Sequence, residues 1–76
     1  MKDTYEQLNT VVSASIRKTM NEGESVHGPG KWMTQSKEFH LNRALKHIAD
    51  YLLHKDPEDL EHALCRVGMA KYQAPQ

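Results

Sequence analysis

Apolar residues near the start of the chain recur at the spacing of one helical face. They are separated by three or four positions along a single stripe, which is widened by one valine: Tyr5, Leu8, Val11, Val12, Ile16 and Met20. Asp3 followed by Glu6 resembles a capping box. The pattern predicts an amphipathic helix over about 4–21. Its apolar face is wide enough to form a contact between two copies of the chain.

The helical periodicity stops between residues 22 and 35. Gly23, Gly28, Pro29 and Gly30 fall in this segment, and Trp32, the only tryptophan, lies near its end. We therefore predict a long loop over 22–35. A tryptophan in such a loop either covers the core or offers a surface for a ligand.

Two further helices are predicted in the C-terminal half, over about 36–55 and 57–72. Ser36 is a suitable N-cap for the first of them. Asp56 and Pro57 combine an N-cap with a proline at the first helical position, which is typical of a helix start. Since so few residues separate the two helices, they should form an antiparallel hairpin. The sequence predicts a single small all-α domain over 1–76, with three helices.

Each helix of this hairpin carries an apolar and a polar stripe. Leu41, Leu45, Ile48 and Leu52 form the apolar stripe of the first helix, and Leu60, Leu64 and Val67 belong to that of the second. The polar stripes should converge between the helices if the turn is centred near Asp56, with Asp50 level with His62 and His47 level with Cys65 or Arg66. The expected polar set is Arg43, His47, Asp50, Asp59, His62 and Arg66.

Three chemistries are compatible with this polar set. Arg43, His47, His62 and Arg66 can bind a phosphate group or a nucleotide, because arginine pairs with phosphate through two hydrogen bonds. His47, Asp59 and His62 can instead bind a transition metal. Alternatively, the charged pairs are ordinary contacts on a solvated helix surface. The residues themselves identify no catalytic group.

Several short segments resemble the phage dATP/dGTP diphosphohydrolase N-terminal-like helical family. They are Lys46-His47, Leu60-Glu61-His62-Ala63 and the earlier run His27-Gly28-Pro29-Gly30-Lys31-Trp32. The resemblance extends over about 26–72. It implies a phage-encoded helical protein of deoxynucleotide metabolism that acts in the cytoplasm of the host cell.

The resemblance also implies positions for the site. It places His47, Asp59 and His62 in the site, and Lys31 and Trp32 on the loop that covers it. Diphosphohydrolases of this kind hold Mg²⁺ through carboxylates from two helices. Here Glu58 and Glu61 have no matching second acidic pair. The chain is therefore expected to be either a metal-dependent diphosphohydrolase that completes its site in a homodimer or a relative that binds without catalysis.

Composition limits the remaining functions. Ten basic and ten acidic residues give a formal net charge of zero, which argues against a nucleic-acid partner. No apolar run is long enough to span a membrane, and a single cysteine is consistent with the cytoplasm. A chain of 76 residues has a marginal core, which favours a homo-oligomer. The alternative function is a small interaction protein, such as a host-factor or defence inhibitor, that docks on a macromolecular partner through its His/Arg face and the loop that carries Trp32.

Overall fold

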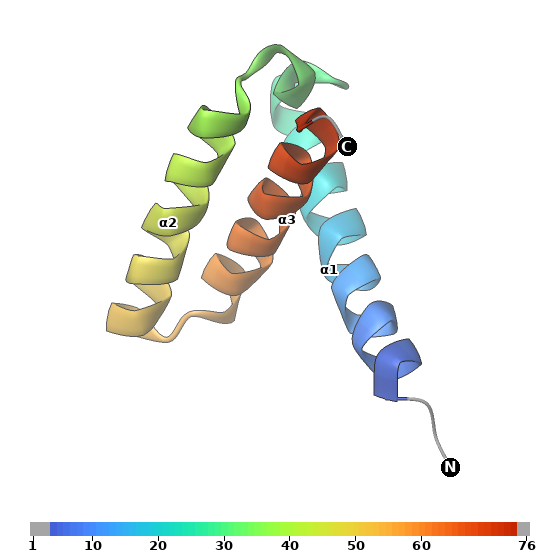
Figure 1. Cartoon of the computed structure of the whole chain (residues 1–76), viewed down its shortest axis with the longest axis vertical. Coiled ribbons are helices and arrows are strands. Elements are labelled where there is room, and N and C mark those ends of the chain that lie inside the picture. Colours follow the sequence, from blue (N-terminus) through green and yellow to red (C-terminus); the bar gives the residue numbers. More distant parts are fainter. Residues whose placement is uncertain (1–3, 75–76) are drawn as a thin grey trace.

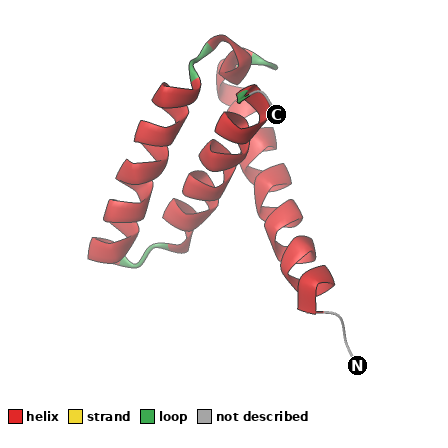
Figure 2. Cartoon of the chain, viewed as in Figure 1, coloured by secondary structure: helices red, strands yellow, loops and turns green. Residues whose placement is uncertain are grey.

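The computed structural model describes residues 4–74, and all of the regular structure in this range is helical (Figure 2). The fold is all-α, as predicted. The elements are α1 (Thr4–His27), a short 3₁₀ helix η1 (Lys31–Thr34), α2 (Lys37–His54) and α3 (Pro57–Gln73). None of the helices in the described range has the length and apolar composition of a membrane span. The predicted N-cap Asp3 lies outside the described residues.

The ends of α2 and α3 follow the signals in the sequence. Ser36 Oγ accepts a hydrogen bond from the backbone N–H of Phe39 at 3.0 Å. Asp56 Oδ1 accepts one from the N–H of Glu58 at 3.0 Å, and Pro57 occupies the first helical turn. Because each side chain satisfies a backbone donor that the helix leaves unpaired, both helices begin where the sequence predicts.

The predicted loop over 22–35 is wrong in its first part, because α1 continues to His27. Gly23 is accommodated inside the helix, and α1 ends where Gly28 adopts a left-handed φ of 89°. The N–H of Gly28 donates to the carbonyl of Glu24 at 3.0 Å, which closes the helix. The connection is also shorter because η1 forms within it. Glu22 and Glu24, on either side of Gly23, are good helix formers, and a single glycine costs a helix only about 1 kcal/mol.

Helix α3 lies between the other two helices (Figure 1). It runs antiparallel to α2, and the C-terminal half of α1 packs on its other side, while the N-terminal half of α1 diverges from it. Gly68 faces α1, and a Cβ atom there would make an ordinary van der Waals contact with Ile16 Cδ1 at 3.9 Å. Lys18 Nζ and Glu61 Oε1 pair across this contact at 3.2 Å.

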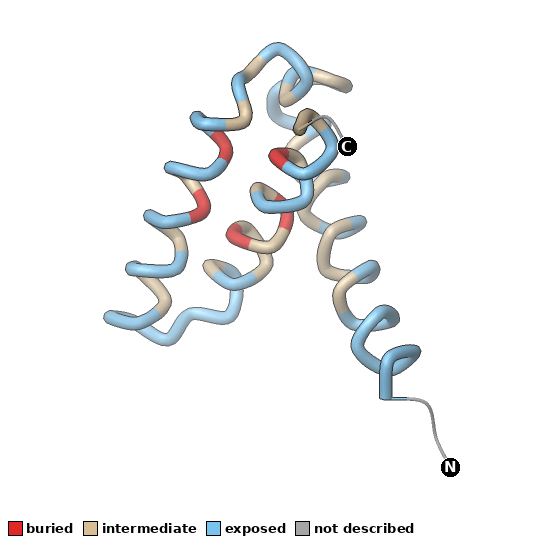
Figure 3. The backbone as a smooth tube through the Cα atoms, in the orientation of Figure 1, coloured by how far each residue is buried: buried red, intermediate tan, exposed pale blue. Residues whose placement is uncertain are grey.

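The core of the chain is made mainly of small side chains. Its buried members lie on α2 and α3 (Figure 3): His40, Ala44, Ala63, Cys65 and Ala70. The long aliphatic residues of the α2 stripe do not join them. Leu45 and Leu52, for example, are each 64% exposed. Helix α2 instead turns its polar stripe towards α3, which brings the candidate functional residues into the interior of the fold.

Candidate anion-binding site

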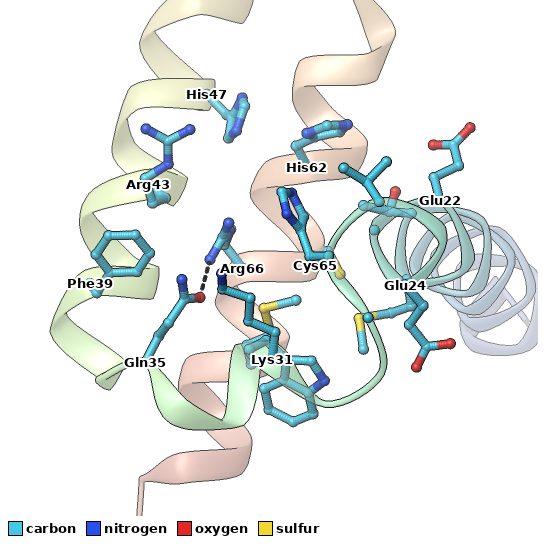
Figure 4. Close-up of a pocket in the computed structure, with 18 residues that line it drawn as sticks. Glu22, Glu24, Lys31, Gln35, Phe39, Arg43, His47, His62, Cys65 and Arg66 are labelled. Carbon is cyan, nitrogen blue, oxygen red and sulfur yellow. Dashed lines mark hydrogen bonds between the residues drawn. The ribbon is translucent and has the colours of Figure 1, made fainter.

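A pocket of about 630 Å³ opens between α2, α3 and the C-terminal part of α1. The segment around η1 closes one end of it. Its volume falls in the range of small-molecule sites in proteins. Trp32 and the other five residues predicted to bind a nucleotide or phosphate all line this pocket. Figure 4 labels those five together with Phe39: Lys31, Phe39, Arg43, His47, His62 and Arg66.

Two arginines, Arg43 and Arg66, face this pocket from α2 and α3. Arg66 Nη1 donates to Gln35 Oε1 at 3.1 Å and to His40 Nδ1 at 2.9 Å, and its guanidinium lies 5.5 Å from the centre of the Phe39 ring. Neither Arg43 nor Arg66 forms an ion pair within residues 4–74. Burial and the charge of Arg43 lower the pKa of Arg66. An anion between the two guanidiniums would relieve this repulsion.

The acidic residues of the pocket do not neutralise the arginines. Glu22 and Glu24 line the pocket from α1, but their carboxylates point away from Arg43 and Arg66 (Figure 4). Lys31 adds a further positive charge. The pocket is therefore locally basic although the whole chain has a net charge of zero. Half-buried arginines that pair with no carboxylate within residues 4–74 make such a site favourable for a phosphate group.

A histidine and a carboxylate pair at the other end of the pocket. His47 Nδ1 and Asp59 Oδ1 are 2.9 Å apart, and both side chains are largely shielded from solvent. The His62 ring lies against the His47 ring at a centroid distance of 4.9 Å. Asp59 can hold His47 in one orientation, as carboxylates do for histidines that transfer protons or bind metals.

A cation could be held at the same end. One ligand atom each from His47, Asp50 and Asp59 lies within 4.8 Å of the others. Asp50 also pairs with Lys46 Nζ at 2.8 Å, and this hydrogen bond lowers the pKa of the carboxyl group. The predicted metal set of His47, Asp59 and His62 thus shares two members with this triad, and His62 lies beside it.

The polar stripes converge as predicted, but in a different register. His47 lies beside Asp59 and His62, and not level with Cys65 or Arg66. Arg66 is level with His40 instead. The end of α2 extends past the start of α3 (Figure 1), so each contact falls closer to the turn on α3 than a symmetric hairpin would place it.

Trp32 mainly holds the end of the pocket together. Its ring packs edge-on against Tyr72 and His40 at centroid distances of 5.4 and 6.3 Å. Its carbonyl accepts hydrogen bonds from His40 Nε2 at 2.9 Å and from Gln73 Nε2 at 3.3 Å. These contacts tie η1 to α2 and α3 and support the covering role that the sequence allows for Trp32.

Two residues that shape the pocket, Phe39 and Gln35, were not among the predicted site residues. Phe39 precedes Arg43 by one helical turn, so the helical period alone could have placed the two on one face. Gln35 carries no comparable signal, because its contact with Arg66 joins residues 31 positions apart.

A scan against protein-family models and searches of curated proteins and of solved structures gave no match for this chain. Its function is therefore inferred from the chemistry of the pocket.

Proposed function

We propose that the protein binds a nucleotide, or a closely related phosphate ester, in the pocket between α2, α3 and α1. The observation that carries this proposal is that Arg43 and Arg66, on facing helices of one pocket, form no ion pair with a carboxylate within residues 4–74. Two such arginines repel one another, and a phosphate group replaces this repulsion with charge-assisted hydrogen bonds.

The rest of the pocket suits the other parts of a nucleotide. Phe39 and Trp32 line it and offer aromatic faces or edges to a base. Lys31 lies where it can reach a further phosphate, since it lines the same pocket. The resemblance to the phage dATP/dGTP diphosphohydrolase family makes purine deoxynucleoside triphosphates the first ligands to test.

A bound metal belongs to the same proposal. The triad of His47, Asp50 and Asp59 combines one nitrogen with two carboxylates. This mixture favours Zn²⁺ or Mn²⁺ over Mg²⁺, which prefers oxygen ligands alone. A metal there would lie at the same end of the pocket as His47 and could bridge to a phosphate. The proposal concerns binding of the nucleotide, whether or not the protein also hydrolyses it.

Calorimetric titration with dATP and dGTP, with and without Mn²⁺, is the direct test. Arg43→Gln is the most informative variant. No hydrogen bond or ion pair of Arg43 is seen within residues 4–74, and therefore its replacement should cost the fold little stability. We expect its nucleotide affinity to fall about 10- to 100-fold, since a hydrogen bond to a charged group contributes about 1.5–3 kcal/mol.

Arg17→Gln is the matched control. It removes the same charge from an exposed position on α1 that does not line the pocket. Equal weakening by both variants would indicate a general charge effect and not a site. Absence of binding heat from every nucleotide, with and without the metal, would reject the proposal. Release of inorganic pyrophosphate or phosphate in the same samples would show whether the bound nucleotide is hydrolysed.

A further inference from the structure

Helices α2 and α3 expose several aliphatic residues on one side of the hairpin, and this surface is called here the hairpin face. It consists of aliphatic residues that are 41–64% exposed: Leu41, Leu45, Ile48, Leu52, Leu60 and Val67. On α2 they follow one another at intervals of three or four positions. The stripe therefore runs along three turns of the helix without a charged side chain among its members.

The hairpin face lies on the side of the hairpin opposite the pocket. At about 100° per residue, the α2 stripe is rotated about 110° from the side of α2 that contacts α3. On α3, Leu60 and Val67 are rotated about 90° in the same sense from the side of α3 that contacts α2. Because the two helices are antiparallel, equal senses of rotation lead to the same side of the pair. Phe39 on α2 and Met69 on α3, which line the pocket, are rotated in the opposite sense.

The exposed area of the chain is larger than its mass requires. The surface measures 5837 Å², whereas a folded monomer of 8.7 kDa exposes about 4,700 Å². The excess of about 1,100 Å² belongs to the whole chain, and both the hairpin face and the exposed apolar residues of α1 contribute to it. It is comparable with the roughly 800 Å² that each partner buries in a standard protein interface. Within residues 4–74, in contrast, the buried core holds three alanines, a cysteine and a histidine.

We infer that the hairpin face is the contact surface for a second copy of this chain. Two hairpins that meet through this face bring four helices together around a shared layer of leucine, isoleucine and valine. Such a layer packs by the same ridges and grooves as a four-helix bundle. In a two-fold contact, each residue of the hairpin face is buried in both copies. The two copies together then form the aliphatic core that one chain lacks. This inference does not depend on the proposed nucleotide binding.

In such a dimer the two pockets remain accessible. Because the hairpin face and the pocket lie on opposite sides of α2 and α3, both pockets point outwards. The polar residues of the two copies do not meet. Each pocket then functions with the residues of its own chain, in contrast to the sequence-based expectation of a site completed across a homodimer.

Sedimentation analysis across a dilution series, combined with Leu45→Glu, tests the inference. We expect the wild type to have a mass twice that of the 8.7 kDa chain. Leu45→Glu should raise the dimer dissociation constant by about 100-fold or more, since a charge is placed twice in the buried layer. Helix content, measured by circular dichroism under conditions where wild type is dimeric, reports whether the variant folds. The milder variant Leu45→Ala should weaken the dimer without adding a charge, so it tests the inference if Leu45→Glu does not fold.

Two control variants distinguish the hairpin face from a contact elsewhere on the chain. Leu53→Glu changes a leucine of the same helix that is 75% exposed and lies outside the hairpin face. Leu8→Glu changes a leucine that is 64% exposed, as Leu45 is, on the apolar stripe of α1. We expect both controls to remain dimeric. A monomeric wild type, or dissociation by Leu8→Glu with an intact Leu45→Glu dimer, would overturn the inference. Nucleotide affinity of the Leu45→Glu monomer, measured separately, tests the pocket alone.

Discussion

Arg66 donates a hydrogen bond from Nη1 to Nδ1 of His40 over 2.9 Å, and His40 is completely buried. Arginine can only donate, so Nδ1 of His40 carries the lone pair. The proton of the neutral ring therefore lies on Nε2, which donates to the carbonyl of Trp32 at 2.9 Å. One histidine thus connects η1, α2 and α3 and holds Arg66 at the edge of the pocket.

Replacement of His40 by phenylalanine should destabilise the fold. The variant keeps an aromatic ring but leaves the Arg66 donor and the Trp32 carbonyl without this partner. We expect a loss of about 1–3 kcal/mol in the free energy of unfolding, measured by urea denaturation. His54→Phe, at an exposed position of the same helix, should change it by less than about 0.5 kcal/mol. Equal effects would show that His40 has no special structural role.

Zn²⁺ should stabilise the folded chain through His47 and the two aspartates near it. We expect the melting temperature to rise with the concentration of free Zn²⁺ and to return to its starting value after chelation. Asp59→Asn should weaken Zn²⁺ binding by about 10-fold or more, whereas His54→Gln should leave it unchanged. His62→Gln shows whether His62 also acts as a ligand. A melting temperature that does not respond to Zn²⁺ or Mn²⁺ would contradict the metal site.

Two glycines of one segment should respond in opposite ways to alanine. Gly28 has a φ of 89°, which a Cβ atom makes unfavourable, so Gly28→Ala should destabilise the fold by about 1–2 kcal/mol. Gly23 lies inside α1, and an added Cβ would find open space. Gly23→Ala should therefore stabilise the helix by about 0.5–1 kcal/mol. Thermal unfolding without ligand measures both. Equal destabilisation would contradict the extension of α1 to His27.

The thiol of Cys65 should be unreactive in the native protein. Cys65 is 2% exposed, and burial raises the pKa of its thiol although Arg66 acts in the opposite direction. Iodoacetamide should modify it slowly until urea unfolds the chain. Rapid modification of the folded protein would contradict its buried position.

The raised pKa of Cys65 also predicts a pH dependence. The thiol ionises first in the unfolded chain, so its contribution to stability is complete below about pH 8.5 and is lost as the pH rises towards the native pKa. The slope cannot exceed about 1.4 kcal/mol per pH unit. Cys65→Ala should remove the pH-dependent contribution of the thiol. The free energies of unfolding of wild type and Cys65→Ala, measured from about pH 7 to pH 10, should therefore differ by this contribution.

The candidate site was only partly readable from the sequence. The period of α2 was sufficient to place Arg43 and His47 on one stripe, and the turn signal at Asp56 indicated that this stripe faces α3. The sequence did not correctly predict which residue of α3 each of them contacts. His47 pairs with Asp59 because α2 extends past the start of α3, and this offset depends on how the two helices pack.

Local signals determined what the sequence could determine by itself. Backbone capping at Ser36 and Asp56 and the helical period predict where α2 and α3 begin, that they form a hairpin, and that the fold is all-α. Both signals act over a few neighbouring residues. Tertiary structure alone decided the offset between α2 and α3, which pairs His47 with Asp59, and the exposure of Leu45 and Leu52 to solvent. An amphipathic pattern defines two opposite faces of a helix, but the neighbouring helices decide which of them is buried.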